Sequence, residues 1–283
     1  ERSPGSTTDA PKTPLSARLG KAFTALWPPV LGVSTFLLLW AVLAPRVNTS
    51  LGSLPGPVEV LQAGRDLWDE FLGARTEEAA FYEAQALRNA DFEAQGLPLQ
   101  DFVYSGPPTF IDQIWTSLRT VALGFAIGTD IAIPLGLLSG LSRTFQRAIN
   151  PLVQIFKPVS PLAWLPIVTM VVAATVTADD PLLPKAFIIS AFVVTLNSLW
   201  PTLINTAVGA SSVDQDLLNV GEVLRLGWLT KLRKIILPSA LPYIFTGMRL
   251  SLGVGWMVLI AAEMLAQNPG LGKFVWDEFQ NGS

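Results

Sequence analysis

The chain of 283 residues is 50% hydrophobic and only 14% charged, whereas soluble domains average about 25% charged residues, so its composition indicates a membrane protein. Its net charge of -3 gives no reason to expect nucleic-acid binding, and the absence of cysteine excludes disulfides, thiolate nucleophiles and cysteine metal ligands. The chain has no histidine either, which removes the commonest general base and makes most enzyme chemistries improbable, so we predict no catalytic residue, metal site or cofactor in it.

The chain starts with a polar leader followed by an apolar segment. Residues 1–20 are rich in Pro, Ser, Thr and Gly, which predicts a disordered leader. Residues 22–45 carry no charge and are long enough for the roughly 20 apolar residues that a membrane span needs. This length favours a transmembrane helix over a signal peptide, whose apolar region is about 7–15 residues long.

A polar, acidic insertion covers residues 46–112. Apolar residues near helical spacing predict one or two amphipathic helices in it, outside the membrane. These residues are Leu61, Leu67, Trp68, Phe71 and Leu72. Because runs of charge are usually solvated faces, a solvated insertion is favoured over a binding surface.

Further apolar segments at residues 114–141, 162–178, 186–208 and 241–265 each predict a transmembrane helix. Two of them carry small residues at every fourth position, which lets another helix approach closely. These residues are Gly124, Gly128, Ala132, Gly136 and Gly140 in one segment, and Gly247, Ser251 and Gly255 in the other. Asp130 is expected to face the interior of the bundle, where an ionisable side chain finds partners.

Prolines interrupt the chain between the first two of these segments. They are Pro151, Pro158, Pro161 and Pro166, which cannot all lie in one regular helix. We expect a short helix at residues 152–156 and a break at residues 157–161, ahead of the next span. Broken helices at membrane depth usually line a cavity or pack against protein.

A polar hairpin at residues 209–240 separates the last two spans. Ser212 is the expected N-cap of its first helix, with Gln215 as its capping-box partner, and Gly227 is the expected end. A second short helix is expected at residues 228–237, where Pro238 stops it. The apolar side of the first helix would consist of Leu217, Leu218, Gly221, Val223 and Leu224.

Lysine and arginine in the short connections give the expected orientation. The leader, residues 143–157 and the hairpin are basic, and all three fall on one side if five spans alternate. This side is expected to be cytoplasmic, which places the N-terminus inside and the acidic insertion outside. The C-terminus would then also lie outside, and a sixth span, absent from this chain, would return it to the cytoplasm.

The hairpin resembles the EAA loop of binding-protein-dependent ABC importer permeases, in which Glu-Ala-Ala is followed by three residues, Gly, nine residues and Ile-x-Leu-Pro. The end of this pattern is matched by Ile235, Leu237 and Pro238. The Glu-Ala-Ala positions hold Asn219, Val220 and Gly221, and the Gly position holds Arg225. The resemblance implies that the hairpin couples this chain to an ATPase, through Leu217, Leu218, Asn219, Val220, Gly221, Glu222, Leu224, Arg225 and Gly227. We therefore expect Gly221→Trp to abolish coupling in a protein that still folds.

Residues 157–167, 205–221 and 248–265 look like the nitrate, sulfonate and taurine permease group. The first span and the acidic insertion are similar to its cyanobacterial nitrate and bicarbonate branch. The resemblance implies an all-α, polytopic type I ABC importer permease fold, in which a first span and insertion at residues 21–112 precede a permease core at residues 113–283. No GxxxxGK[ST] phosphate loop occurs in the sequence, so ATP and Mg would be bound by separate ATPase subunits.

The same resemblance implies the partners: a second copy of the chain, two ABC ATPase subunits and an extracellular or periplasmic solute-binding protein, in the lipid of the inner (plasma) membrane. Nitrate or nitrite is the first expected solute, and bicarbonate or a sulfonate is the alternative. A secondary transporter or channel that uses no ATP is a different class of function. Such a protein would have no use for a docking hairpin.

Five residues are candidates for the translocation pathway: Arg119, Pro161, Trp164, Arg249 and Glu263. Arg249 could contact the anion or pair within the protein. Glu263 could gate the pathway, pair with Arg119 or lie solvated at the membrane interface. Trp164 could line the cavity or simply pack.

Overall fold

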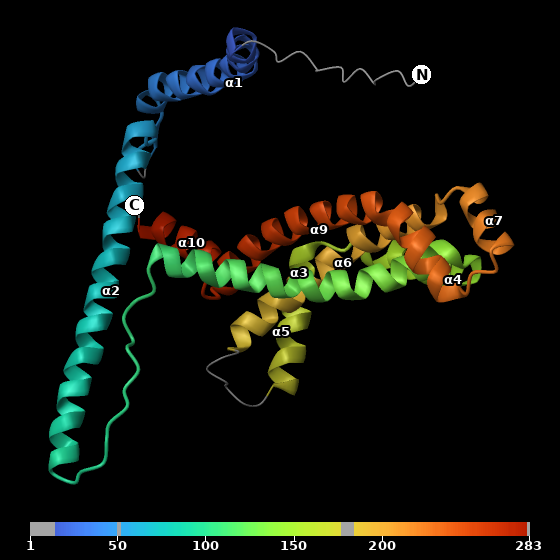
Figure 1. Cartoon of the computed structure of the whole chain (residues 1–283). Helices are drawn as coiled ribbons and strands as arrows, with labels where there is room; N and C mark the ends of the chain where they lie inside the picture. The colour runs from blue at the N-terminus through green and yellow to red at the C-terminus, as the bar shows by residue number, and fades with distance from the viewer. Residues whose placement is uncertain (1–14, 50–51, 177–183, 282–283) are drawn as a thin grey trace, which may run out of the picture. The chain divides into compact units, whose positions relative to one another are not determined.

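The computed structural model describes residues 15–49, 52–176 and 184–281, and these are mainly helical (Figure 1). The chain divides into two compact units, residues 1–69 and 70–283. Within the described residues, four helices are long and apolar enough to cross a membrane, and a bent helix pair could supply a fifth span. The prediction of an all-α, polytopic membrane fold is therefore confirmed.

The first unit contains the first candidate span. Helix α1 (Leu15–Leu43) continues into the 3-10 turn η1 (Ala44–Arg46), and the span covers Leu26–Arg46. Residues 1–14 of the predicted leader lie outside the described residues, and residues 15–20 belong to α1. Residues 15–20 contain no proline, and the span's helix extends back through them. After η1, strand β1 (Asn48–Thr49) pairs antiparallel with β2 (Gly52–Ser53).

The acidic insertion forms one long helix, α2 (Pro57–Ala94), whose residues from Glu70 onward belong to the second unit. Side-chain amides of this helix hold the extended segment that follows it. Asn89 Nδ2 donates to the Gln100 carbonyl at 2.9 Å, and Asn89 Oδ1 accepts from the Gln100 amide at 3.1 Å. Gln85 Oε1 accepts from the Phe102 amide at 3.1 Å. Backbone groups of the extended segment therefore form hydrogen bonds with side chains of α2 and not with a neighbouring strand.

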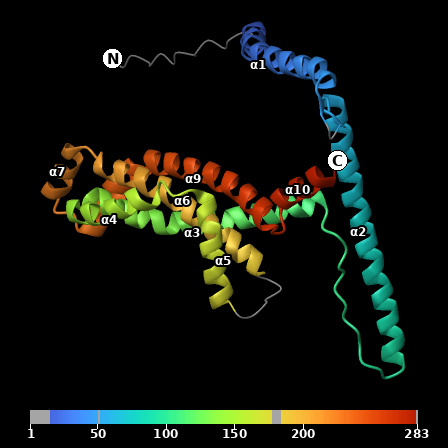
Figure 2. The same cartoon turned by 180° about the vertical axis from the view of Figure 1, so that it is seen from behind.

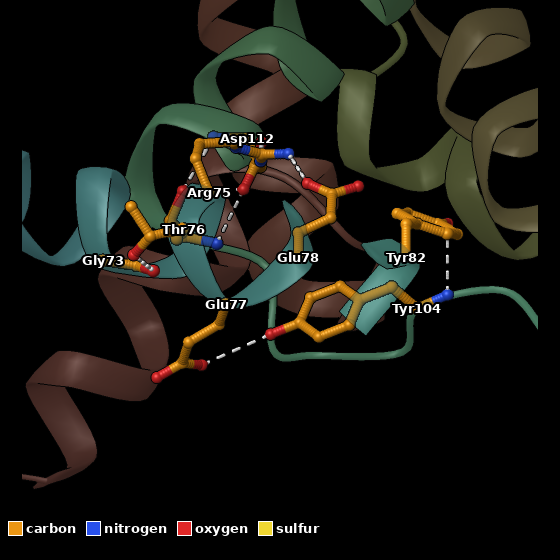
Figure 3. Close-up of polar contacts among 9 residues, drawn as sticks. Gly73, Arg75, Thr76, Glu77, Glu78, Tyr82, Tyr104 and Asp112 are labelled. Atoms are coloured by element: carbon orange, nitrogen blue, oxygen red, sulfur yellow. Dashed lines mark hydrogen bonds and ion pairs between the residues drawn. The ribbon is translucent and has the colours of Figure 1, made fainter. Parts of the chain in front are cut away.

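A polar cluster joins α2 to the start of α3 (Phe110–Leu141), as Figure 3 shows. Arg75 forms ion pairs with Glu78 and with Asp112. Asp112 also accepts from the backbone amide of Thr109 at 3.1 Å and so closes a capping box at the start of α3. Tyr104, in the extended segment, donates to Glu77 at 3.4 Å. This cluster explains why α3 begins at Phe110, four residues before the predicted start.

Helix α6 (Lys185–Ser211) lies between α3 and α9 (Leu237–Ala266) and packs along both (Figures 1 and 2). The small residues of α3 face α6: a Cβ atom on Gly124 would lie 2.6 Å from the Ala191 carbonyl oxygen. A Cβ on Gly136 would lie 2.7 Å from the Leu203 carbonyl oxygen. There is thus no room for side chains at these positions, and the predicted packing role is confirmed.

The small residues of α9 also pack against α6. A Cβ on Gly247 would lie 3.0 Å from the Pro201 carbonyl oxygen. Ser251 is fully buried, donates to the Ser198 carbonyl and shares a hydrogen bond of 2.7 Å with the Thr202 hydroxyl. This predicted packing face is also confirmed, and it adds a polar contact between the two helices.

The proline-rich segment forms α4 (Arg143–Phe156), the 3-10 turn η2 (Pro161–Ala163) and α5 (Trp164–Thr175). The two parts meet at an angle of 88°, so the predicted break is confirmed. The predicted start of the short helix at residue 152 is wrong, because α4 begins after Ser142, whose hydroxyl accepts from the Phe145 amide at 3.3 Å. Pro151 lies within α4 on an exposed position, where the carbonyl that it leaves unpaired can find another partner. Residues 177–183, which include the end of the predicted span, lie outside the described residues.

Candidate functional site

The hairpin between α6 and α9 starts with α7 (Gln215–Val223). Its N-cap is Asp214, whose carboxylate accepts from the Asp216 amide at 2.9 Å. The predicted cap, Ser212, instead ends α6, and its hydroxyl donates to the Gly209 carbonyl at 3.1 Å. The capping prediction was therefore wrong, because α6 continues further than expected and a better acceptor follows two residues later.

Arg225 ends α7 in a left-handed conformation, with φ 48°. The Arg225 amide donates to the Glu222 carbonyl and the Leu226 amide to the Gly221 carbonyl, both at 2.9 Å. The chain therefore turns at Arg225, and not at Gly227 as predicted; Gly227 is the N-cap of α8 (Trp228–Lys231). Glycine adopts such a φ with little steric cost, which gives a physical reason for the glycine that the EAA pattern has at this position.

The second helix of the hairpin continues into the last span, so the prediction that Pro238 stops it is wrong. After α8, the chain makes a π-helical turn, η3 (Leu232–Ile236), and enters α9 without a break. Pro238 follows the π turn directly, and the changed hydrogen bonding of that turn accommodates the missing amide hydrogen. As a result, one candidate span runs from Trp228 to Ala266.

The hairpin is packed on its inner side through Gly221. A Cβ atom there would lie 2.9 Å from Ile235 Cδ1, and Gly221 is buried. Glu222 forms an ion pair of 3.2 Å with Lys231, which ties α7 to α8. A tryptophan at position 221 would therefore displace Ile235 and disturb the hairpin itself, so this substitution does not isolate coupling.

The outer side of the hairpin is apolar and exposed. The residues predicted to form one apolar side differ in burial. Gly221 is buried and Leu218 is half-buried, whereas the remaining apolar residues of α7 are exposed. Exposed apolar side chains are Leu217, Val220, Val223, Leu224, Trp228 and Leu229. Val220, which occupies an Ala position of the EAA pattern, is 52% exposed.

The candidate pathway residues lie at separate places in the bundle. Arg119 is exposed on α3, and its guanidinium carbon lies 5.0 Å from the Trp115 ring centroid. Pro161 begins η2 at the break, and Trp164 packs against Phe156 with ring centroids 5.6 Å apart. Arg249 is exposed on α9. Among the described residues, no hydrogen bond or ion pair joins two of these five candidates.

Glu263 departs most from expectation, because it is only 1% exposed. It neither pairs with Arg119 nor lies solvated. Its carboxylate accepts from the Ser117 hydroxyl on α3 at 2.8 Å and from the Gly272 amide at 2.9 Å. Gly272 lies at the start of α10 (Leu271–Asn281). Glu263 therefore connects α3, α9 and α10.

Asp130 is exposed on α3, so the prediction that it faces the interior of the bundle is wrong for this chain. It lies two residues from both Gly128 and Ala132, about 200° around the helix from each. Those two residues face α6, so Asp130 points away from it.

Sequence reasoning missed the residues that surround Glu263. Ser117 and Gln113 lie one turn apart on α3, and Gln113 Oε1 accepts from the Gly270 amide at 2.8 Å. A signal was present in the sequence. Asn-Pro-Gly-Leu-Gly at residues 268–272 predicts a tight turn, and Glu263 lies in the last turn of the apolar helix just before it.

Comparison with known proteins places this architecture. Residues 132–282 match the family described as the binding-protein-dependent transport system inner membrane component. The chain is 31% identical over 283 residues to the nitrate import permease protein NrtB of Leptolyngbya laminosa, covering 99% of this chain and 85% of the relative. It is 33% identical to NrtB of Synechocystis and 34% identical to the bicarbonate transport system permease protein CmpB of Synechococcus elongatus, in each case covering 89% of this chain and 77% of the relative.

Proposed function

Because this chain belongs to the family of binding-protein-dependent transport system inner membrane components, we propose that it is the transmembrane permease subunit of an ABC importer that carries a small inorganic anion inward. Nitrate or nitrite is the first candidate solute, since the nitrate permease of Leptolyngbya laminosa aligns with 99% of this chain, acidic insertion included. Bicarbonate is the second, because a bicarbonate permease is 34% identical over 89% of the chain.

ATP hydrolysis in separate subunits drives the import in this proposal, and the hairpin transmits it. The supporting observation is the exposed apolar outer side of α7 and α8, which Leu217, Val220 and Trp228 help to form. A short helix with an apolar face fits a hydrophobic groove on a partner protein. The inner packing of Gly221 on Ile235 and the continuous run into α9 make the hairpin stiff enough to transmit a rigid-body movement.

The working assembly that we propose has two copies of this chain, two ATPase subunits and a solute-binding protein. The hairpin and the N-terminus lie on the cytoplasmic side, as the basic residues of the short connections suggest. The chain supplies no catalytic residue, and ATP and Mg are bound by the ATPase subunits. Arg249, exposed on α9, is the first candidate for contact with the anion.

The test is uptake by proteoliposomes that contain the permease, its ATPase subunits and the binding protein. Isotope-labelled nitrate should accumulate only with ATP on the hairpin side, and an ATPase without its catalytic base should abolish uptake. Accumulation of labelled bicarbonate but not nitrate would select the second candidate. Uptake that persists with the inactive ATPase would instead identify a secondary transporter or channel.

A further inference from the structure

The carboxylate of Glu263 is held in a closed polar cradle at one end of the helix bundle. Ser117 Oγ on α3 lies 2.9 and 2.8 Å from the two carboxylate oxygens and donates to them. The same hydroxyl accepts from the Leu271 amide at 2.8 Å. We call Glu263, Ser117, Gln113 and residues 270–272 the clamp.

Backbone amides at the start of α10 complete the clamp. The Gly272 amide donates to Glu263 and the Gly270 amide to Gln113. The amides at the start of a helix carry a partial positive charge that stabilises a nearby anion. The Glu263 carboxylate lies at this end of α10 and is stabilised by it. Glu263 is 1% exposed and Ser117 is fully buried, so these hydrogen bonds do not compete with water.

The two glycines of the clamp are fixed by its geometry. Gly270 has φ 150°, and a Cβ atom there would overlap the Glu263 carboxylate. A Cβ on Gly272 would overlap the Ile260 carbonyl oxygen. The turn between α9 and α10 therefore closes directly around the carboxylate, and neither glycine can gain a side chain while it stays closed.

Helix α9 connects the clamp to the hairpin. The run from Trp228 to Ala266 forms one candidate span, with the hairpin at its start and Glu263 near its end. Its α9 part alone has 30 residues, which corresponds to about 45 Å of helix. A displacement of the hairpin therefore reaches the other end of the bundle through α9, and Glu263 is where α9 is bonded to both α3 and α10.

We propose that Glu263 is a positioning residue for the import cycle, whose carboxylate clamps the α9–α10 turn onto α3 so that α10 and the adjoining ends of α3 and α9 move as one rigid body. This inference rests on the proposed function as an ABC importer permease. Without the clamp, the α9–α10 turn would bend when α9 moves, and the movement would not be transmitted to α10 and the adjoining end of α3.

The first test replaces the carboxylate in the reconstituted complex. In Glu263→Gln one oxygen becomes an NH2 group. The oxygen that remains can still accept from the Gly272 amide, but the NH2 group cannot accept from the Ser117 hydroxyl as the second carboxylate oxygen does, and the negative charge at the start of α10 is lost. Binding-protein-stimulated ATP hydrolysis and uptake should each fall about tenfold, whereas basal ATP hydrolysis should stay within about twofold of wild type. The matched control is Asp277→Asn on α10, a half-buried carboxylate outside the clamp that pairs with Lys273 at 3.9 Å; it should leave all three rates unchanged. Wild-type stimulation in Glu263→Gln would overturn the proposal.

The second test restores the connection covalently and does not depend on the stability of Glu263→Gln. Phe110 on α3 and Phe274 on α10 lie with ring centroids 5.0 Å apart, and the chain contains no other cysteine to interfere. Cross-linking Phe110→Cys to Phe274→Cys should leave uptake intact in the otherwise wild-type protein and should restore it in Glu263→Gln. Loss of uptake on cross-linking the otherwise wild-type protein would show that α10 must separate from α3, and would refute the rigid-body role.

The two proposals fail in different ways. If the wild-type complex shows no ATP-dependent uptake, the proposed function fails. If the wild-type complex transports and the cross-link blocks it, or if Glu263→Gln transports equally well, only the clamp fails. A structural role alone predicts that Glu263→Gln loses basal and stimulated ATP hydrolysis together and that the cross-link does not rescue them, which would also overturn the positioning role.

Discussion

Arg225 has a left-handed backbone conformation, which is sterically unfavourable for a residue with a side chain. At φ 48° a residue with a Cβ atom is less stable than glycine by about 1 kcal/mol. We therefore expect Arg225→Gly to stabilise the end of α7 by about that amount, which corresponds to about fivefold slower hydrogen exchange at the Leu226 amide that closes the turn. Hydrogen exchange followed by mass spectrometry measures this protection.

The control for this substitution is Arg225→Ala, which removes the charge and keeps the Cβ atom. It should leave the exchange rate of the Leu226 amide close to that of wild type, since the strain remains. Equal protection in Arg225→Ala and Arg225→Gly would mean that the guanidinium, and not the backbone conformation, destabilises the turn.

The spacing of charged residues from the small residues of α9 shows whether their burial could have been predicted from the sequence. Gly247, Ser251 and Gly255 mark the packed face at every fourth position, and Glu263 continues the same series two steps later. Its burial was therefore predictable. Arg249 lies midway between Gly247 and Ser251, which places it on the opposite, exposed face. The partners of Glu263 were not predictable, because they come from α3 and from a turn far along the chain.

At the scale of helices, the α3–α6 contact depends on the absence of side chains. A Cβ on Gly136 would lie 2.6 Å from the Thr206 Cβ and 2.7 Å from the Leu203 carbonyl oxygen. Gly136→Ala should therefore destabilise the bundle by about 1–3 kcal/mol, as overpacking does. Thermal unfolding of the purified protein in detergent measures the effect. Gly253→Ala on α9 is the matched control, because nothing lies within 4 Å of its Cβ position, and helix propensity predicts no loss there. Equal stability of the two variants would contradict this account.

Prolines show where local rules stop predicting elements. The rule that proline ends a helix predicted the break after Phe156 correctly, because further prolines follow at once and leave no regular turn. It failed at Pro238, where a π-helical turn precedes the proline and the helix continues. It also failed at Pro151, which lies inside α4. Whether the hydrogen bond that proline removes can be replaced depends on neighbours that the local sequence does not specify.

For the whole molecule, hydropathy and small-residue spacing were sufficient to predict the four helices of the described residues that are long enough to cross a membrane. Both signals are local to one helix and follow directly from the apolar surroundings of a span. The span predicted at residues 162–178 is different, because α5 has only 12 residues and could contribute to a span only together with α4. The hairpin was located by its spacing to Pro238, but its inner and outer sides were not separated. That distinction depends on Ile235, which fills the space beside Gly221 and leaves Val220 outside.

The outer side of the hairpin gives the prediction that tests coupling in the assembled transporter. Val220 is 52% exposed, so Val220→Glu places a charge on the proposed docking face without filling buried space. A charge that must enter an apolar groove is costly to desolvate, and we expect the ATPase to bind at least about tenfold more weakly. Titration of the ATPase onto permease in nanodiscs measures this affinity. Val103→Glu, at a position that is 80% exposed in the extended segment after α2, introduces the same charge away from the hairpin and should bind normally. If both variants bind the ATPase as wild type does, the hairpin is not the docking element, because a docked hairpin would have to bring the carboxylate that Val220→Glu introduces into the apolar groove of the ATPase.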